Sequence, residues 1–318
     1  MTAALAPAIP ALAATPAADR AAIATIVESV GTFADTHNFE SLAKLYDDDV
    51  MVDYSSLSGE PATLKSPQAL MTEWASVLPG FDRTRHDLSD VHVVLSGDTA
   101  SATADVSASH WVEGEMWRVD GRYDYGLERD PVDDAWKITA MTFTVEDETG
   151  SRDVFGPATE KARTNPAAWI QRQRAQQTVW DFLTGLEDKD MDRVNGVWAE
   201  DAVQHMPYTP HGVDFPSEVV GRDALIRQYA GWPDNAGKAD FTSELRFYPT
   251  VDPQIVVAEY RGVSAIIPTG RTYDQRYLGL FHVDPEGRIE LFREYFNPEV
   301  FAHAFGLRED GVFHAGDE

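Results

Sequence analysis

Cysteine is absent from the 318-residue chain, which excludes disulfide bonds, thiol catalysis and metal sites built on thiolates. Basic residues are scarce, because 26 lysines and arginines stand against 53 aspartates and glutamates, for a formal net charge of -27. Such a chain repels phosphate groups, so no nucleic-acid or membrane partner is expected. No apolar run reaches the length of a membrane-spanning helix. The lack of cysteine is typical of a reducing compartment, and we expect a cytoplasmic protein.

Motifs for cofactors and metals are also missing. Three consecutive aspartates, Asp47 to Asp49, lack the spacing and the glycine of a calcium-binding loop and indicate an acidic turn. The histidines do not have the spacing of a zinc site, and no glycine-rich phosphate-binding loop is present. We therefore expect no cofactor and no bound metal.

Length and composition indicate two folded domains. Hydrophobic residues make up 43% of the chain, enough for each half to build a core, and 318 residues exceed what one core usually serves. Residues 1–18 are rich in alanine and proline without a basic residue, which predicts a disordered leader rather than a signal peptide. Residues 153–168 contain Gly156, Pro157 and Pro166 and predict a linker. The domains are therefore expected at residues 19–152 and 169–308, followed by a tail at residues 309–318.

The first half begins with helices and ends with strands. Apolar residues at three- and four-residue spacing predict a helix over residues 20–35, and a short helix at 39–46 and a strand at 50–54 follow. A further helix starts near Ser66, with Pro67 at its first position. Alternating apolar residues then predict a strand meander, with strands at residues 91–95, 100–112, 116–128 and 136–146.

The second half repeats this order of elements. Three pairs of residues align between the halves at separations of 152, 155 and 151 residues: Asp49 with Asp201, Leu70 with Leu225, and Ile138 with Ile289. A repeat of this length indicates a duplicated domain rather than a solenoid, whose periods are far shorter.

The order of helix, short helix, acidic turn, strand, helix and four strands resembles the SnoaL-like, or nuclear-transport-factor-2-like, superfamily in each half. The resemblance implies an α+β fold of two tandem cone-shaped domains, each a curved, mostly antiparallel sheet wrapped around helices and a deep pocket. That superfamily holds ketosteroid isomerases, polyketide cyclases and dehydratases, so the fold alone does not select a reaction. Its members commonly pair their sheets, which implies an intramolecular pseudo-dimer or a homodimer.

The first half resembles scytalone dehydratase. Phe33-Ala34-Asp35 precedes the short helix as in that family, Val52-Asp53-Tyr54 fits its Ile-Asp-Tyr strand, and Thr84-Arg85-His86 fits its Thr-Gln-His segment. The resemblance implies that His110 and His86 act as base and acid in an elimination of water, oriented by Asp53 and Tyr54. The remaining pocket positions depart from the family pattern, so scytalone itself is not the expected substrate. The residues expected there are His37, Tyr123 and Tyr125.

The second half resembles limonene-type epoxide hydrolases and phenazine-biosynthesis condensing proteins. Pro268-Thr269-Gly270 and Arg293-Glu294-Tyr295-Phe296 fit the hydrolase pattern. That mechanism needs two carboxylates and an arginine, but Gly262 stands at the place of the first carboxylate and Tyr260 at that of the arginine. The resemblance therefore disfavours epoxide hydrolysis by such a pair and leaves Glu294 at the place of the acid in both families.

Glu294 is also a candidate acid from its own surroundings. Alternation places it on the same side of a strand as Phe292 and Phe296, where burial raises the pKa of a carboxyl group. We expect it to act as a general acid assisted by His205, in a pocket lined by Tyr260, Gln275 and Tyr277. A surface glutamate paired with an arginine is the alternative.

These observations favour a cofactor-free enzyme, a lyase (dehydratase) or an isomerase or cyclase. It would move protons in a hydrophobic, oxygenated, aromatic or polyketide-like small molecule of secondary metabolism. Two other readings stay open: an epoxide hydrolase or epoxide-opening cyclase, and a non-catalytic small-molecule binding protein. Which of the two domains is active is left open by the sequence.

Overall fold

The computed structural model describes residues 15–209 and 215–307. The chain divides into two compact units, Met1–Ala167 and Ala168–Glu318, and each is described here by itself. Most of the leader expected at residues 1–18, up to residue 14, and the tail expected at residues 309–318 lie outside the described residues. The expected pairing of the two sheets within one chain stays a prediction.

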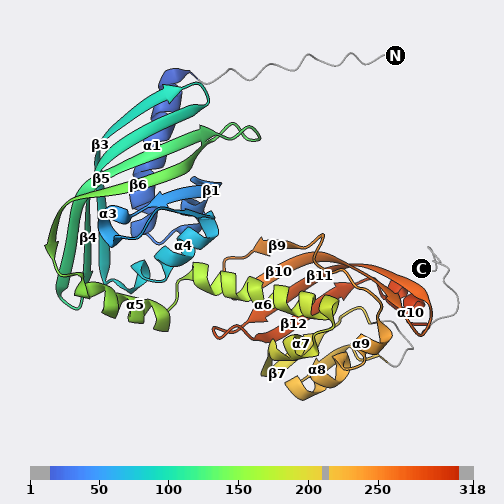
Figure 1. Cartoon of the computed structure of the whole chain (residues 1–318). Helices are drawn as coiled ribbons and strands as arrows, with labels where there is room; N and C mark the ends of the chain where they lie inside the picture. Colours follow the sequence, from blue (N-terminus) through green and yellow to red (C-terminus); the bar gives the residue numbers. More distant parts are fainter. Residues whose placement is uncertain (1–14, 210–214, 308–318) are drawn as a thin grey trace, which may run out of the picture. The chain divides into compact units, whose positions relative to one another are not determined.

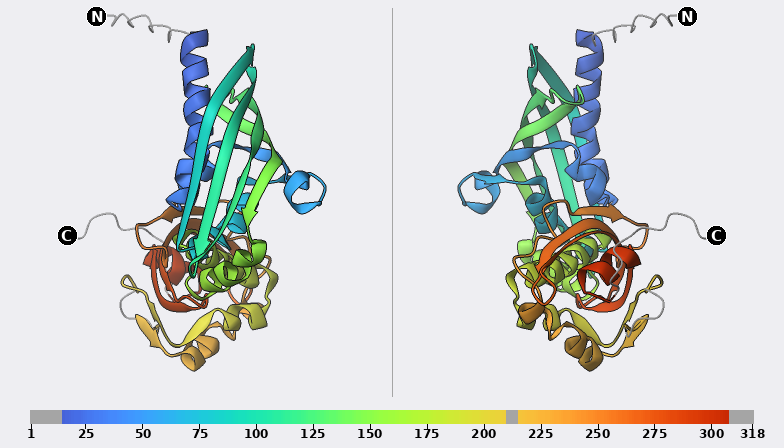
Figure 2. Two further views of the ribbon diagram at one scale, coloured as in Figure 1. Left: turned by 90° about the vertical axis from the view of Figure 1, so that its left-hand side faces the viewer. Right: turned by 90° about the vertical axis from the view of Figure 1, so that its right-hand side faces the viewer.

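The first unit is organised around the long helix α1, Pro16–Asp35. The Thr15 hydroxyl caps its N-terminus, and Pro16 takes the first helical position, where proline is favoured. Its apolar face is buried, and α1 runs alongside the long strands of the sheet (Figure 2). The shorter helical elements are α2 (Phe39–Ala43), α3 (Ser55–Ser58), α4 (Pro67–Ala75), η1 (Leu78–Gly80), η2 (Arg152–Val154) and α5 (Phe155–Thr164).

The sheet of the first unit has the strand order β2-β1-β6-β5-β4-β3 (Figure 1). Its long strands pair antiparallel in sequence order, whereas β1 pairs parallel to β6 and antiparallel to β2. The strands are β1 (Tyr46–Asp53), β2 (Thr63–Lys65), β3 (Arg83–Ser96), β4 (Thr99–Val112), β5 (Glu115–Arg129) and β6 (Trp136–Gly150).

Two glycines allow backbone approaches that shape the first unit. A Cβ added to Gly31 of α1 would lie 2.7 Å from Leu88 Cδ1 and 3.0 Å from His86 Cβ, so α1 rests directly on β3. A Cβ added to Gly80 of η1 would lie 1.7 Å from the carbonyl oxygen of Ala158, so η1 packs against the backbone of α5. A larger residue at either position would push a helix away from the interior.

The second unit repeats this arrangement, with the strand order β8-β7-β12-β11-β10-β9. Tyr46 pairs with Ile138 in the first sheet, and Trp198 pairs with Ile289 at the same place in the second. The elements are α6 (Ala168–Asp188), α7 (Met191–Gly196), β7 (Trp198–His205), β8 (Glu218–Val220), α8 (Arg222–Tyr229), α9 (Trp232–Asn235), β9 (Arg246–Pro249), β10 (Ile255–Ile266), β11 (Arg271–Val283), β12 (Ile289–Phe296) and α10 (Pro298–Ala304). The expected α+β fold of two tandem domains is confirmed.

The core of the second unit is an aromatic cluster. Phe281 and Phe292 stack with ring centroids 4.2 Å apart, and Phe182 meets Trp198 edge-on at 5.3 Å. All four side chains are at most 1% exposed. This cluster packs helix α6 against the sheet, and α6 in turn forms part of the wall of the second cavity.

Two expectations about local structure were wrong. The acidic run Asp47–Asp49, expected as a turn, lies within β1, and its counterpart in the second half, Glu200 and Asp201, lies within β7. Each run stands where its strand shifts register against its parallel neighbour. The register shift lets several acidic side chains stay at the surface inside a strand. The segment expected as a linker at residues 153–168 is largely helix α5, because Ala158 and Ala162 bury one of its faces.

Candidate functional site

The first unit encloses a cavity of about 170 Å³. Its wall comes from α1, the inner face of the long strands and α5, and most of the lining side chains are apolar or aromatic. The hydroxyl and imidazole groups in the wall belong to Tyr54, Tyr123, His86 and His110. Four of the residues expected from the sequence therefore meet in one cavity.

Asp35, the last residue of α1, holds His86 on β3. Its Oδ1 lies 2.7 Å from His86 Nδ1, and its Oδ2 accepts a hydrogen bond of 2.8 Å from the His86 backbone N–H. The Thr84 hydroxyl donates a further bond of 2.8 Å to Oδ1. Burial raises the pKa of Asp35, but these hydrogen bonds outweigh it, and the pKa lies below its ordinary value. The carboxylate is therefore ionised and accepts the Nδ1 proton, which leaves Nε2 of His86 as a proton acceptor.

His110 has a different environment. Its ring is 5% exposed, meets His86 at a centroid distance of 5.2 Å, and lies among Phe81, Trp117 and Phe155. Burial lowers the pKa of His110 to about 3, with a smaller contribution from His86. Its Nδ1 has no hydrogen-bond partner among the described residues. His110 is thus a neutral imidazole and a weak base at neutral pH.

Two tyrosine hydroxyls complete the first cavity. Tyr54 follows β1 and Tyr123 comes from β5, and their hydroxyls interact with each other. Burial raises the pKa of Tyr54 well above its ordinary value and that of Tyr123 to about 12. Both hydroxyls therefore stay protonated, and the O–H that is not used in the bond between them can donate a hydrogen bond to an oxygen in the cavity.

Three residues expected in this cavity do not line it. The carboxylate of Asp53 points away and accepts a hydrogen bond from the Ser55 backbone N–H, so the expectation that it orients the histidines was wrong. His37 stacks on Phe39 in the turn after α1. Tyr125 is buried one layer below Tyr123, at a ring-centroid distance of 5.5 Å. The carboxylate that contacts a histidine of this cavity is therefore that of Asp35 and not that of Asp53.

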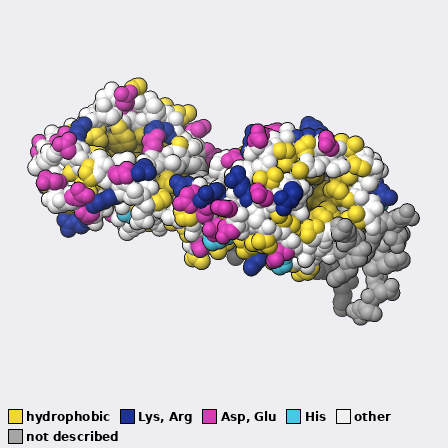
Figure 3. Space-filling model, turned by 90° about the horizontal axis from the view of Figure 1, so that it is seen from below, with side chains coloured by type: hydrophobic (Ala, Val, Ile, Leu, Met, Phe, Trp, Pro, Cys, Tyr) yellow, Lys and Arg dark blue, Asp and Glu magenta, His cyan; other side chains and the backbone are white. Residues whose placement is uncertain are grey.

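The second unit encloses a larger cavity of about 330 Å³. Its wall is built by α6, α8, α9 and α10 together with the inner face of the sheet. Figure 3 shows hydrophobic side chains gathered around a hollow of this unit, at the right of the view. The cavity lies within the range of small-molecule pockets.

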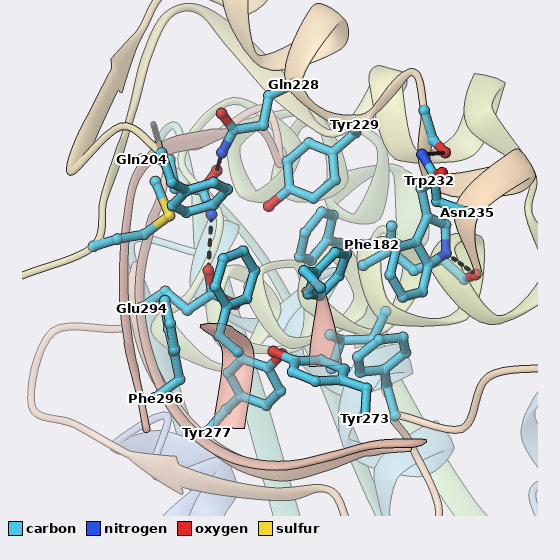
Figure 4. Close-up of a pocket in the computed structure, with 18 of the residues that line it drawn as sticks. Phe182, Gln204, Gln228, Tyr229, Trp232, Asn235, Tyr273, Tyr277, Glu294 and Phe296 are labelled. Carbon is cyan, nitrogen blue, oxygen red and sulfur yellow. Dashed lines mark hydrogen bonds between the residues drawn. The ribbon is translucent and has the colours of Figure 1, made fainter. Parts of the chain in front are cut away.

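Glu294 on β12 projects into this cavity (Figure 4). Its Oε2 accepts a hydrogen bond of 2.9 Å from Gln204 Nε2, and Gln204 Oε1 accepts one of 3.3 Å from Gln228 Nε2. Burial raises the pKa of Glu294 to about 7, against the opposing hydrogen bonds from Gln204 and Tyr260. A carboxyl group with this pKa can donate or accept a proton near neutral pH.

Four tyrosines surround this carboxyl group. The rings of Tyr260 and Tyr277 stack with centroids 4.8 Å apart, and the hydroxyls of Tyr277 and Tyr273 share a hydrogen bond. Tyr229 of α8 faces the same cavity (Figure 4). Tyr260 and Tyr277 thus lie in the wall where alternation along β10 and β11 placed them.

Two residues expected beside Glu294 lie elsewhere. His205 is beside Arg293 in the register of β7 and β12, on the opposite face of the strand from Gln204, so its expected partnership with Glu294 was wrong. Gln275 does not line the cavity either, because its amide exchanges hydrogen bonds of 2.8 Å and 3.2 Å with the backbone of Asn297 and so holds the start of α10.

The structure gives a physical reason why position 262, where the hydrolase pattern has a carboxylate, is a glycine here. A Cβ added to Gly262 would lie 2.5 Å from Cε1 of Phe241, so the ring of Phe241 fills the space that a side chain at this position would need. Glu294 is the one carboxyl group among the described residues that line this cavity.

Asp35, Gln204 and Gln228 were missed as site residues. Gln204 could have been found, because Ala202, Gln204 and Met206 alternate on one face of β7 and that face is buried. Asp35 and Gln228 meet their partners through tertiary packing, 51 and 24 residues away, and carry no local signal.

In the described parts of the chain, no three His, Asp or Glu side chains gather as metal ligands would. None of the helices placed by the structure is long and apolar enough to cross a bilayer.

Replacing Glu294 by glutamine is expected to stabilise the second unit at pH 8 by roughly 3 kcal/mol and at pH 5 by about 1 kcal/mol. The folded pKa of about 7 lies above the ordinary value of 4.5, so the unfolded chain releases this proton first. The free energy of unfolding of the unchanged second unit therefore falls as the pH rises from about 4.5 to about 7, and the full loss is present above pH 7. Urea unfolding read by pulsed hydrogen exchange of β12 peptides measures it. Exposed Glu290 on the same strand supplies the control Glu290→Gln, and a gain independent of pH would contradict the prediction.

Comparison with known proteins gives the same division of the chain. Residues 15–142 and residues 179–292 each match a model described as a SnoaL-like domain. The uncharacterized protein YesE of Bacillus subtilis is 31% identical over 134 residues, which are 42% of this chain and 88% of that protein. An uncharacterized PhzA/B-like protein of Pseudomonas aeruginosa is 26% identical over 132 residues, covering 42% and 90%. The crystal structure of a phenazine biosynthesis-related protein from Pseudomonas aeruginosa is 20% identical, with a TM-score of 0.39, and covers 49% of this chain and 98% of its own.

Proposed function

The chain belongs to the SnoaL-like family, with two of its domains in tandem, and we propose that the first domain is a lyase that removes water from a compact β-hydroxy ketone. The observation that carries the proposal is the contact of Asp35 with His86, whose ring lines an apolar cavity. An imidazole oriented by a carboxylate is a general base suited to neutral pH.

His86 is the base in this proposal and Asp35 its positioning residue. Nε2 of His86 takes the proton from the carbon next to the carbonyl group, and the electrons of that C–H bond form the new double bond. The bond from the neighbouring carbon to the hydroxyl group breaks, and the imidazolium returns its proton to the leaving oxygen. The substrate is thereby split into an unsaturated ketone and water, and His86 is regenerated.

The other polar groups support this step. Tyr54 and Tyr123 are hydrogen bonded to each other, and the hydroxyl that accepts in this pair donates its own proton to the carbonyl oxygen, where negative charge develops as the substrate proton leaves. His110 is too weak a base to take the proton, so its expected role and that of His86 are exchanged in this proposal. As a neutral group, His110 can hydrogen bond to the leaving hydroxyl.

The cavity also limits the substrate. About 170 Å³ is smaller than the usual pocket for a drug-sized molecule, so we expect a body of one or two rings. Its described lining holds no lysine, arginine, aspartate or glutamate, which favours an uncharged molecule.

The test uses 3-hydroxy-1-tetralone, a two-ring β-hydroxy ketone that loses water to give 1-naphthol. The full-length protein is expected to raise the rate of naphthol absorbance above that of buffer. Incubation in heavy water separates isomerisation from dehydration, because an isomerase returns a deuteron to carbon without forming naphthol. A molecule that is bound and recovered unchanged, with no deuterium, would favour a binding protein over the enzyme.

Changing Asp35 to asparagine is expected to lower kcat for this probe about 100-fold with little change in KM. The amide removes the charge that stabilises the imidazolium, while the cavity that binds the probe stays the same. Asp87, exposed on the same strand as His86, gives the matched control Asp87→Asn, which should leave kcat unchanged. A change confined to KM would show that Asp35 acts only on the shape of the cavity.

A further inference from the structure

The second cavity combines aromatic walls with a single charge. Eleven of its twenty lining residues are Phe, Tyr or Trp, and Glu294 is the one side chain among these described residues that can carry a full charge at neutral pH. No lysine, arginine or histidine is among the residues that line it. This composition is the opposite of a site for a carboxylate or a phosphate, which needs cationic groups.

Glu294 has no cationic partner among the residues that the structure describes. Within the described ranges, neutral Gln204 and Tyr260 are the groups that hydrogen bond to its carboxyl group, and no cationic side chain there acts on it. A buried carboxylate without a countercharge is costly, and a ligand that carries a positive charge would supply it.

The aromatic rings suit the same ligand. The face of an aromatic ring is negative and attracts an ammonium group, most strongly for tryptophan and tyrosine. Tyr229, Tyr260 and Tyr277 interact with Glu294, while Phe182, Trp232 and Phe301 are further aromatic residues of the cavity wall. The three tyrosines would surround a charged head, and the other three rings would bury an apolar body.

We propose that the second domain binds a hydrophobic organic cation, a protonated amine on a ring-bearing body, with its ammonium group against Glu294. This inference is independent of the reaction proposed for the first domain. Glu294 is ionised in the complex, and the ammonium group donates hydrogen bonds to its carboxylate, which can accept more bonds than those from Gln204 and Tyr260.

The affinity for a neutral ligand should change with pH in the opposite direction to that for a cation. A carbonyl compound would need the protonated form of Glu294 as hydrogen-bond donor and would bind less tightly as pH rises, whereas a cation needs the ionised form and would bind more tightly. The other titratable groups that face Glu294 are Tyr229, Tyr260, Tyr273 and Tyr277, and burial raises the pKa of each above its ordinary value. Glu294 is therefore the group in this wall that changes its charge between pH 6 and pH 8.

The experiment compares tryptamine with tryptophol, which differ in an ammonium and a hydroxyl head on the same indole body. Isothermal titration of the full-length protein is expected to give at least tenfold tighter binding of tryptamine at pH 8. An alkylamine stays protonated over this range, so the affinity for tryptamine should fall about tenfold from pH 8 to pH 6, as the carboxyl group with a pKa of about 7 takes up its proton. Tryptophol should show no such loss.

Variants assign the binding to this cavity. Glu294→Gln keeps the shape of the side chain and should lower the affinity for tryptamine at pH 8 at least tenfold, whereas Glu290→Gln on the outer face of β12 should not change it. Thermal unfolding of each variant checks that the fold is kept. Equal affinity for both probes, tighter binding at pH 6, an unchanged affinity in Glu294→Gln, or no binding of either probe at millimolar concentration would each overturn the proposal.

Discussion

Replacing His86 by alanine is expected to lower kcat/KM for dehydration of 3-hydroxy-1-tetralone by about 100- to 10,000-fold. The variant removes the group that is proposed to take the proton, and no other described residue of the first cavity is suited to replace it. His110 lies 5.2 Å away between ring centroids, but burial lowers its pKa to about 3, so it competes poorly for a proton from carbon. The rate of naphthol formation, measured by absorbance, gives the result directly.

A matched control is available on the same strand. His92 of β3 is exposed and lies outside the cavity, so His92→Ala should keep full activity. His110→Ala should cost less than His86→Ala, because it removes a hydrogen-bonding group rather than the base. The reverse order, with His110→Ala the more damaging variant, would restore the assignment expected from the sequence and refute the one proposed from the structure.

Truncating Phe182 to alanine is expected to destabilise the second domain by about 3–5 kcal/mol. This ring on α6 is 1% exposed and touches Trp198, Tyr229 and Phe292 at centroid distances of 5.3, 5.5 and 5.7 Å. Its loss removes aromatic contacts and leaves a void continuous with the second cavity. Urea unfolding read by pulsed hydrogen exchange separates the transition of this domain from that of the first.

The first domain serves as the internal reference for this experiment, because its transition should not move. Leu278→Ala on β11 is the second control, since this side chain is 45% exposed and should cost no more than about 0.5 kcal/mol. A loss below about 1 kcal/mol for Phe182→Ala would mean that the aromatic cluster closes over the gap.

The fold could be predicted from the sequence because its signals are local and occur twice. The apolar spacing over residues 20–35 predicts α1, and alternation predicts the strands that follow. The two strand orders then follow from the repeat. The acidic stretches were wrongly predicted to be turns, because a register shift inside a strand cannot be recognised from the order of the residues.

The sites were predicted less well, and one error accounts for two wrong residues. Asp53 and His205 were placed inward, yet both lie on the outer face, and the residues before them, Val52 and Gln204, are the buried ones. Because a strand alternates at every residue, an error of one position exchanges the inside and the outside in both copies.

Asp35 shows the limit of prediction from local patterns. The residue stands at the end of an amphipathic helix, and nothing near it in the chain points to His86, 51 residues later. The contact depends on Gly31, which lets α1 rest on β3 so closely that the carboxylate reaches the imidazole. Such a pairing comes from the packing of a helix on a sheet.

Each copy places a helix after its last strand, and a phenylalanine of that helix forms part of the cavity wall: Phe155 of α5 in the first and Phe301 of α10 in the second. The repeated unit of this chain therefore includes the helix after the last strand as well as the sheet. A fragment of the first copy that stops at Gly150, where β6 ends, would lack Phe155 and so this part of the cavity wall. A piece of the chain that keeps the whole helix with this phenylalanine extends through Thr164, where α5 ends.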